Sequence, residues 1–359
     1  MKIFHICDVG NKVNGIYSVL VPLSTEQRAL GHEVAVYNIH KSGYNDDTLR
    51  LISTKDLIAR IETEKPDIVL FHGIFYWAVI PISRRLISLK IPYLIELHGS
   101  MSLLNIGKSR FKKKLASWLF LNSIIRRAKA IVYLNMQEYC LSAIRQLNPK
   151  SIVIPNGIYR KQNQIPTDHL LNKKLEILYL GRIQNAHKGT DVLIEALKLL
   201  QDKGYDKEIH LSFYGKVIRS EEQWFDEQMK SISAIADFRG QVYGKDKEDA
   251  FSKANIFILT SRYEGFPMAI LEALSYGCPC IVTPMTNIAD IVASNRCGWI
   301  TTLDPLSIAQ TILEAAADYR ANHEQLISRS RLAVEELEWS EIAATAVAKY
   351  QAALIDNIR

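Results

Sequence analysis

The chain has 359 residues and a formal net charge of +6, and 48% of its residues are hydrophobic and 23% charged. These proportions are typical of a globular protein and exclude a disordered chain, while the length suggests two domains. No apolar run reaches the length of a membrane-spanning helix. The five cysteines, at positions 7, 140, 278, 280 and 297, follow no disulfide or zinc-site spacing, which favours a reducing cytosol.

The positive charge is concentrated in the first half of the chain. Residues 1–161 hold 23 Lys and Arg against 11 Asp and Glu, whereas residues 162–359 hold 21 against 27. We therefore expect an anionic partner to meet the first half. Nucleic acid is not the expected partner, because no nucleic-acid-binding module accompanies the charge.

The first half alternates predicted strands and helices. A buried strand over residues 2–8 opens the chain, a loop containing Gly15 follows, and a helix covers residues 16–30. Further strands are predicted over 33–37, 68–72, 93–98, 130–134 and 151–154. This alternation implies a parallel sheet with helices on both faces. Because the N-terminus enters a strand at once and lacks a signal-peptide pattern, we expect a cytoplasmic protein.

Two histidines end predicted strands in this half. His72 and His98 are each followed by glycine, and parallel α/β sheets bind their ligands outside the carboxyl ends of strands. A single histidine is more often structural than functional. Position alone therefore leaves both roles open for these residues.

A basic stretch covers residues 108–129, with eight Lys and Arg and no acidic residue. Trp118, Leu119 and Phe120 lie between its two basic clusters. A basic helix with aromatic residues can lie on an anionic membrane surface, which would make the protein peripheral at the inner face of the membrane. The alternative is a helix packed on the core with a solvated basic face.

The pattern restarts after a polar connector that runs from Asn156 to about residue 172. A strand is predicted over 174–180, a helix over 191–202 and a strand over 209–214. Residues 243–254, 256–260 and 279–283 are expected to continue this second sheet. We therefore predict two doubly wound domains, over residues 1–156 and 157–338.

Two cations flank the first loop of the second half. Arg182 follows the strand, and Lys188 stands just before the helix that begins near Thr190. A planar guanidinium and an ammonium point charge together suit a diphosphate. The alternative is a basic loop capped by Thr190. In either case His187 is expected to be a solvated neighbour.

The segment over residues 254–277 reads as strand, loop and helix. Gly265 and Pro267 break the strand pattern, and Gly277 ends the helical spacing that starts at Met268. The start of a helix offers free N–H groups that favour a phosphate. Since Pro267 has no N–H, Phe266, Met268 and Ala269 would supply them.

Two carboxylates, Glu264 in the loop and Glu272 on the helix, are eight residues apart. In a helix this separation spans about 12 Å at about 1.5 Å per residue. That distance excludes a shared proton and the paired carboxylates of a glycosidase, but it suits the two ends of a nucleotide sugar. An isolated pair at this spacing would equally fit two solvated surface charges.

The whole stretch SRYEGFPMAILEALSYGCPCIVT, from residue 261, resembles the donor-site signature of retaining glycosyltransferases of family 4, which have the GT-B fold. GR-x5-KG-x-D, from residue 181, resembles the diphosphate motif of the same family. The resemblance extends over nearly the whole chain and is most specific in the second half. It implies an α/β protein with two Rossmann-like domains that face a central cleft. It also implies that a C-terminal helix, residues 339–359, crosses back to the first domain.

Similarity to this family implies a role for each matching residue. Glu264 would hold hydroxyls of the donor sugar and Glu272 the ribose, while Arg182 and Lys188 would stabilise the departing diphosphate. His98 would touch the donor sugar near the reaction centre, so it joins Glu264, Arg182 and Lys188 as a candidate catalytic residue. The donor would also meet several positions chiefly through their backbone: Gly15, Val242, Gly265, Phe266, Met268 and Ala269.

The resemblance implies hexose transfer from a nucleotide sugar to a hydroxyl of a saccharide or lipid-linked acceptor, with retained configuration, in polysaccharide or glycolipid synthesis. UDP-sugars of the UDP-glucose type are the favoured donors. His72 has a placement similar to that of His98, and both a structural role and a role in lining the acceptor side stay open for it. No D-x-D signature is present, so we expect no divalent metal and no cofactor.

Two departures from the family pattern stand out. The family often has two adjacent glycines where this chain has only Gly15. It usually has a glycine-rich loop ending in Glu where this chain reads MTNIAD, ending at Asp290.

Two rival classes of protein also remain open. One is a GT-B-like nucleotide-sugar epimerase and the other a nucleotide-binding protein without catalysis. A nicotinamide or flavin enzyme is not expected, because a G-x-G-x-x-G fingerprint is absent.

Overall fold

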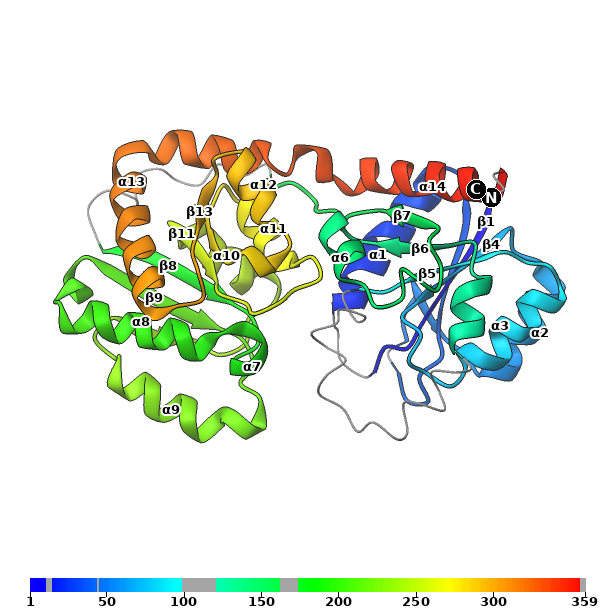
Figure 1. The fold of residues 1–359 in the computed structure, drawn as a ribbon, viewed down its shortest axis with the longest axis horizontal. Coiled ribbons are helices and arrows are strands. Elements are labelled where there is room, and N and C mark those ends of the chain that lie inside the picture. Colours follow the sequence, from blue (N-terminus) through cyan, green and yellow to red (C-terminus); the bar gives the residue numbers. More distant parts are fainter. Residues whose placement is uncertain (11–14, 44, 99–120, 162–173, 356–359) are drawn as a thin grey trace. The chain divides into compact units, whose positions relative to one another are not determined.

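A computed structural model describes residues 1–10, 15–43, 45–98, 121–161 and 174–355 (Figure 1). The chain divides into two compact units, of which the first comprises Met1–Gly157 with Leu337–Arg359 and the second Ile158–Glu336. Each unit has its own parallel sheet. The expected class, two α/β domains built on parallel sheets, is confirmed.

The first unit contains a seven-stranded sheet in the order β3-β2-β1-β4-β5-β6-β7. From β1 the chain moves outward through β2 and β3 and then returns to build the other side from β4. Because crossovers between parallel strands are right-handed, this reversal puts helices on opposite faces of the sheet, and the strand order switches direction between β1 and β4. The strands are β1 Lys2–Cys7, β2 Glu33–Asn38, β3 Leu49–Leu51, β4 Ile68–His72, β5 Tyr93–Glu96, β6 Ala130–Tyr133 and β7 Ser151–Val153.

The helices of the first unit cover an apolar sheet, whose central strands β4, β5 and β6 are buried along their whole length. The C-terminal helix α14 packs on α1 (Figure 1). Gly157 lies against Trp339, the first residue of α14, so closely that a Cβ there would come 2.5 Å from the indole. The helices are α1 Gly15–Ala29, α2 Thr54–Glu64, α3 Val79–Ser88, α6 Met136–Leu141 and α14 Trp339–Ile355.

The second unit contains a six-stranded sheet in the order β10-β9-β8-β11-β12-β13, with the same reversal between β8 and β11. Its strands are β8 Leu175–Leu180, β9 Ile209–Tyr214, β10 Ala236–Phe238, β11 Ile256–Leu259, β12 Cys280–Val282 and β13 Gly298–Ile300. Its α-helices are α7 Asn185–Lys188, α8 Thr190–Asp202, α9 Glu222–Ser231, α10 Gly244–Lys253, α11 Met268–Ser275, α12 Ala289–Ser294 and α13 Pro305–Leu332. Short 3-10 turns lie at η2 Tyr205–Lys207, η3 Arg219–Glu221, η4 Pro284–Thr286 and η5 Glu335–Leu337.

One predicted element is wrong. Residues 243–254 were expected to continue the sheet, but Gly244–Lys253 is the helix α10, and the edge strand is β10, Ala236–Phe238. The sequence GKDKEDAFSK holds charged helix formers, and its two buried residues, Ala250 and Phe251, anchor one short face. The strand β10 escapes prediction because three residues show no periodicity.

Some expectations fall outside the described residues. The polar connector lies there from 162 to 173, as does the basic segment up to residue 120, while residues 121–127 are helical. In the part of the chain that the structure describes, no helix is both long and apolar enough to cross a membrane. All five cysteines are described and are free thiols.

Candidate functional site

Gly189 allows two loops of the second unit to meet at the carboxyl edge of its sheet. It has φ +64° and joins α7 to α8, and a Cβ there would come 2.2 Å from the carbonyl oxygen of Thr260. Only glycine combines this backbone conformation with so close an approach. The loop that carries Lys188 therefore packs directly on the segment that leads from β11 to Glu264.

The carboxylate of Glu264 is paired at this junction. Lys188 Nζ lies 2.5 Å from Oε1, and Ser261 Oγ donates to the same oxygen at 2.5 Å. The exposed fractions of the two side chains are 9% for Glu264 and 13% for Lys188, so both charges are shielded from water and depend on each other. The structure thus brings together two of the predicted site residues that are 76 positions apart.

His187 differs from its prediction as a solvated neighbour. Its ring stacks on Tyr263 with centroids 4.3 Å apart, and its Nε2 lies 3.8 Å from Glu264 Oε2. Only 14% of the side chain is exposed. Burial lowers the pKa of His187, against the opposing effect of the Glu264 carboxylate. The prediction failed because the stacking partner is distant in sequence.

The backbone of Glu264 is held from the other side by the loop after β12. Glu264 N donates to the Met285 carbonyl at 3.0 Å, and Asn287 Nδ2 donates to the Glu264 carbonyl at 2.6 Å. Asn287 has φ +59°, a conformation that asparagine tolerates better than most residues. Asp290 is exposed in the first turn of α12. Met285 and Asn287 of the MTN sequence at 285–287 therefore hold the backbone of Glu264 through hydrogen bonds.

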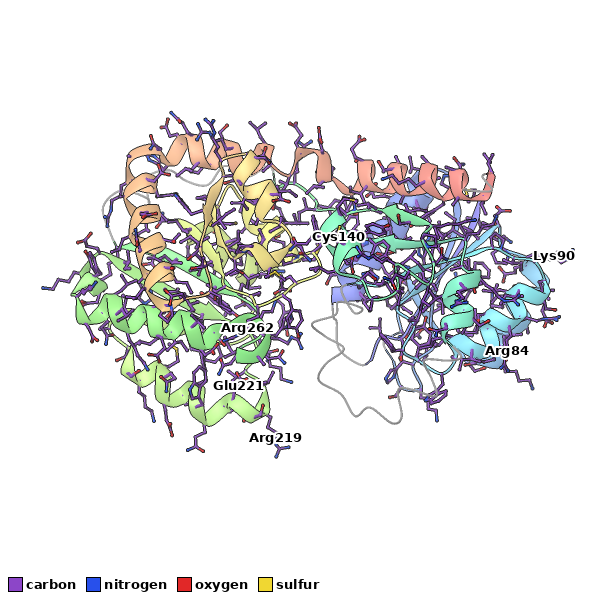
Figure 2. All side chains as sticks on the ribbon, viewed as in Figure 1. Arg84, Lys90, Cys140, Arg219, Glu221 and Arg262 are labelled. Atoms are coloured by element: carbon purple, nitrogen blue, oxygen red, sulfur yellow. The ribbon has the colours of Figure 1, made fainter. Side chains whose placement is uncertain are left out.

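Arg262 braces the same junction, and sequence reasoning did not single it out. Its guanidinium makes a two-pronged ion pair with Asp191, at 2.7 and 2.8 Å, and also donates to the Asn185 carbonyl. The Asn185 N–H in turn donates to the carboxylate of Glu221 at 2.8 Å. Figure 2 labels Arg262 and Glu221 on this unit. The opposite charges of Asp191 and Arg262 were visible in the sequence, but their proximity was not.

Arg182 follows β8 and is exposed. Tyr179 OH donates to its carbonyl oxygen at 2.9 Å, which fixes the backbone at the strand end. The positive charges of Arg182 and Lys188 both lower the pKa of His187, whereas the Glu264 carboxylate raises it. Arg182 therefore shares the edge with the Lys188–Glu264 pair, and no ion pair of its guanidinium is seen within the described residues.

Helix α11 begins beside this pair without a side-chain cap. Its N-cap residue is Pro267, and Phe266 before it is buried.

On the same helix, Glu272 Oε1 lies 2.6 Å from Lys247 Nζ of α10. Lys247 is a second residue that sequence reasoning missed, since it lies in the segment predicted as part of the sheet. Val242, half-buried, comes just before α10.

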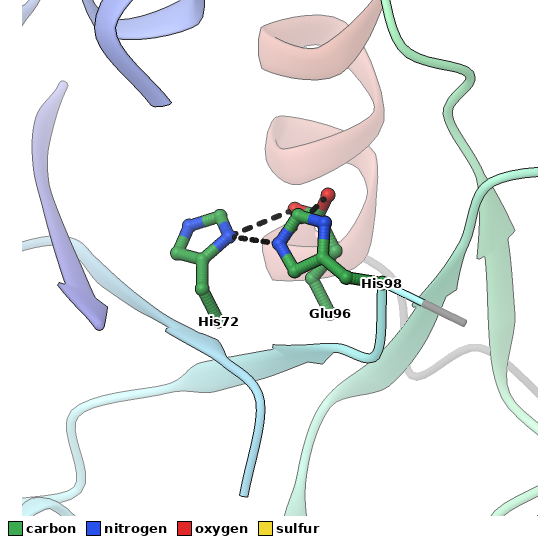
Figure 3. Close-up of side chains that lie close together, drawn as sticks. All are labelled: His72, Glu96 and His98. Atoms are coloured by element: carbon green, nitrogen blue, oxygen red, sulfur yellow. Dashed lines mark hydrogen bonds and ion pairs between the residues drawn. The ribbon is translucent and has the colours of Figure 1, made fainter. Parts of the chain in front are cut away.

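In the first unit, His72, Glu96 and His98 converge at the carboxyl ends of β4 and β5 (Figure 3). His72 and Glu96 are register partners on these strands. His98 follows two residues later with φ +48°, and its Nε2 lies 2.9 Å from His72 Nδ1. The two predicted histidines are thus direct neighbours, and Glu96 is a partner that the sequence did not indicate.

Burial dominates the electrostatics of this cluster. It raises the pKa of Glu96 to about 8, with a further contribution from the Glu138 carboxylate, and lowers the pKa of His98 to about 4. Each shift favours the uncharged form.

Gly15, the first residue of α1, is exposed, and a Cβ there would have no neighbour within 4 Å.

Comparisons with known proteins identify the family of the chain. Residues 174–318 match the family described as glycosyl transferases group 1, and residues 13–161 match glycosyltransferase family 4. The chain belongs to the family 4 glycosyltransferases. The two matched regions together cover most of the chain and contain every candidate site residue of both units.

Family members with curated names match over shorter regions. Mannosylfructose-phosphate synthase of Agrobacterium fabrum is 32% identical over 113 residues, which are 30% of this chain and 25% of that protein. D-inositol 3-phosphate glycosyltransferase of an Arthrobacter species is 25% identical over 187 residues, which are 50% of this chain and 43% of that protein. The chain thus spans less than half the length of either relative.

Solved structures match over the full length. Sucrose-phosphate synthase from Thermosynechococcus elongatus superposes with a TM-score of 0.77 at 16% identity, covering 98% of this chain and 99% of that one. HepE from Anabaena, in complex with UDP, gives 0.78 at 16% identity, covering 98% and 100%. These structural neighbours have the GT-B fold, which confirms the fold class.

Proposed function

We propose that the protein is a retaining glycosyltransferase that moves a hexose from a nucleotide sugar to a hydroxyl of a saccharide or lipid-linked acceptor. The observation that carries this proposal is the shielded Lys188–Glu264 pair, at a sheet edge that also holds Arg182 and the uncapped start of α11. This edge combines fixed positive charge, backbone amides and a carboxylate. Such a set can bind a diphosphate and an adjoining sugar.

In this proposal Lys188 and Glu264 exchange partners when the donor binds. Without a donor, each charge neutralises the other at 2.5 Å. A donor diphosphate would draw the Lys188 ammonium to its oxygens and free Glu264 to accept hydrogen bonds from the sugar hydroxyls. Arg182 would then balance the second phosphate as the glycosidic bond breaks. The diphosphate itself would accept the proton of the acceptor hydroxyl on the same face of the sugar.

We propose that Glu272 holds the ribose through its two hydroxyls. Its present partner, Lys247, lies 2.6 Å away and keeps the carboxylate oriented from the neighbouring helix. The backbone at Gly265, Phe266, Met268 and Ala269 would meet the diphosphate, and Val242 would lie near the base. In the first unit, Gly15 would approach the donor, His98 would contact its sugar, and His72 would support His98 from 2.9 Å.

UDP-sugars of the UDP-glucose type are our proposed donors. HepE, a structural neighbour, has been solved with UDP-glucose. We propose further that transfer needs no divalent metal at the diphosphate, since Arg182 and Lys188 supply positive charge there. Synthesis of a polysaccharide or glycolipid at the cytoplasmic face of a membrane is the setting that we propose.

The testing experiment is nucleotide release from UDP-, GDP- and ADP-sugars in EDTA, without an acceptor. Slow release from one donor, abolished in Glu264→Ala, would support a metal-independent transferase and identify its donor. Formation of an epimer would instead indicate a nucleotide-sugar epimerase. Binding of nucleotide without turnover, even after acceptors are added, would indicate a protein that binds nucleotides without catalysis.

A further inference from the structure

Five polar side chains form a continuous chain of hydrogen bonds and close polar contacts in the first unit. Gln27 of α1 contacts His5 of β1, His5 contacts His72 of β4, and His72 contacts both His98 and Glu96. Four of the five side chains are buried, and His98 is 10% exposed. Polar side chains buried together in this way demand an account of every donor and acceptor.

The order of protons along this chain follows from its first contact. Gln27 Oε1 is an acceptor 2.9 Å from His5 Nε2, so this nitrogen of His5 carries the proton. A neutral imidazole has only one N–H, hence His5 Nδ1 accepts from His72 Nε2 at 2.8 Å. By the same argument His72 Nδ1 has a lone pair. That lone pair points away from His5, toward His98 and Glu96 (Figure 3).

Three potential metal-ligand atoms meet at one point. His72 Nδ1 lies 2.9 Å from His98 Nε2 and 3.4 Å from Glu96 Oε2, and His98 Nε2 lies 3.5 Å from Glu96 Oε1. One ligand atom of each residue lies within 4.8 Å of the others. Two ligand atoms at about 2.0–2.1 Å from a tetrahedral zinc ion stand about 3.3 Å apart. The measured separations lie on both sides of that value.

We propose that His72, Glu96 and His98 bind a divalent transition-metal ion of the zinc type. Two imidazoles and one carboxylate are a ligand set that such ions use, and they leave a fourth coordination position open. Strand register places His72 opposite Glu96, and the left-handed backbone at His98 turns its ring back onto them. The contacts of His72 with His5 and of His5 with Gln27 supply the outer hydrogen bonds that orient a ligating histidine.

Metal binding here would fix the protonation of His98. With the metal on Nε2, the neutral ring keeps its proton on Nδ1 and becomes a hydrogen-bond donor. The positive charge of the ion would also offset the cost of burying an ionised Glu96 carboxylate. All residues of this site belong to the first unit.

The test is metal binding by the full chain without a histidine tag. Protein stripped with dipicolinic acid is titrated with Zn²⁺ against a chromophoric chelator, and separately with Co²⁺ while the visible absorption is recorded. We expect one Zn²⁺ per chain and the intense visible bands of Co²⁺ in a site of low coordination number. Wild-type protein that binds no stoichiometric Zn²⁺ and gives only the weak spectrum of hydrated Co²⁺ would overturn the proposal, whether or not any variant folds.

Variants locate the site. Glu96→Gln should weaken Zn²⁺ binding by at least ~10-fold, and His5→Asn, which removes only an outer contact, by about 10–100-fold. The matched control is His210→Gln, because His210 lies 3.1 Å from Glu176 and 3.9 Å from Asp237 but outside the cluster. Equal Zn²⁺ affinity in wild type and Glu96→Gln, or loss of binding in His210→Gln alone, would refute the assignment.

Discussion

At the scale of single residues, the two carboxylates of the candidate donor site are already paired. Glu264 is bound by Lys188 and Ser261, and Glu272 by Lys247. A carboxylate paired in this way is oriented before any ligand arrives, which reduces the cost of ordering it on binding. Because the groups are paired, replacing one residue also leaves the charge of its partner without a counter-charge.

We predict that Glu264→Gln lowers turnover by about 10²–10³-fold, the typical effect of removing one group that acts in the transition state. Binding of free UDP should change little, since this nucleotide has no sugar for Glu264 to hold. Initial rates of nucleotide release and calorimetric titration with UDP measure the two effects. Glu195→Gln, which alters the partly exposed Lys198–Glu195 pair on α8, is the control. Equal losses in turnover and in UDP affinity would contradict the assignment of Glu264 to the sugar.

Glu272→Ala should act in the opposite way. Loss of its hydrogen bonds to the ribose should weaken UDP binding by about tenfold, which corresponds to about 1.4 kcal/mol. Lys247→Ala should weaken it less, because Lys247 only orients the carboxylate from 2.6 Å. Calorimetry with UDP and with UMP checks both variants. If Glu272→Ala binds UDP with wild-type affinity, the ribose is held by another group.

At the scale of elements, close approaches between loops position the site. The junction of α7 and α8 contacts the segment after β11 through Gly189, and the loop at 285–287 holds the same segment from the other side. The Arg262–Asp191 ion pair joins this segment to the first turn of α8. Contacts with neighbouring segments therefore fix the positions of these loops.

Gly189→Ala tests this arrangement. The new Cβ would lie 2.2 Å from the Thr260 carbonyl oxygen in a backbone with φ +64°, so the two loops must separate. We expect a loss of unfolding free energy above the ~1 kcal/mol that a left-handed alanine alone costs, together with loss of turnover. Gly204→Ala is the matched control, since Gly204 has φ +82° but open space around its Cβ position. Denaturant unfolding measures both, and equal destabilisation would show that the close approach is unimportant.

At the scale of the whole molecule, the charge is distributed unevenly between the two halves of the chain. Residues 1–161 carry a net +12 and the remainder −6. The basic segment 108–129 supplies eight of the cations. We propose that this segment lies on an anionic membrane surface, where a lipid-linked acceptor would be found.

Liposome co-sedimentation checks this proposal. The wild type should sediment with vesicles that contain anionic phospholipid and lose that binding as salt rises, because surface electrostatics are screened. Replacing Lys112, Lys113 and Lys114 with Glu should abolish it, while nucleotide release without an acceptor should persist. A matched charge change at Lys41, Lys55 and Lys90, elsewhere in the first half, controls for net charge. Undiminished binding by the first variant would disprove the membrane role of the segment.

The sequence by itself determined the class of fold, most of the strands and the motifs of the candidate donor site. Periodicity shows where apolar strands alternate with helices, and a glycine or proline after a strand is a local signal that needs no partner. Lys188 and Glu264 stand beside predicted helix starts, and the resemblance of their two motifs to the family singled them out as candidates. The helix α10 and the three-residue strands β3, β10 and β13 were not predicted, because charge patterning and short length hide their periodicity.

Only the tertiary structure decided which charges meet. The Lys188–Glu264 contact joins residues 76 positions apart, and the Arg262–Asp191 ion pair spans 71. The approach of His72, Glu96 and His98 depends on the register of β4 and β5 and on one left-handed residue. Sheet order and register are set by packing over the whole core, so they place distant side chains together without leaving a local trace in the sequence.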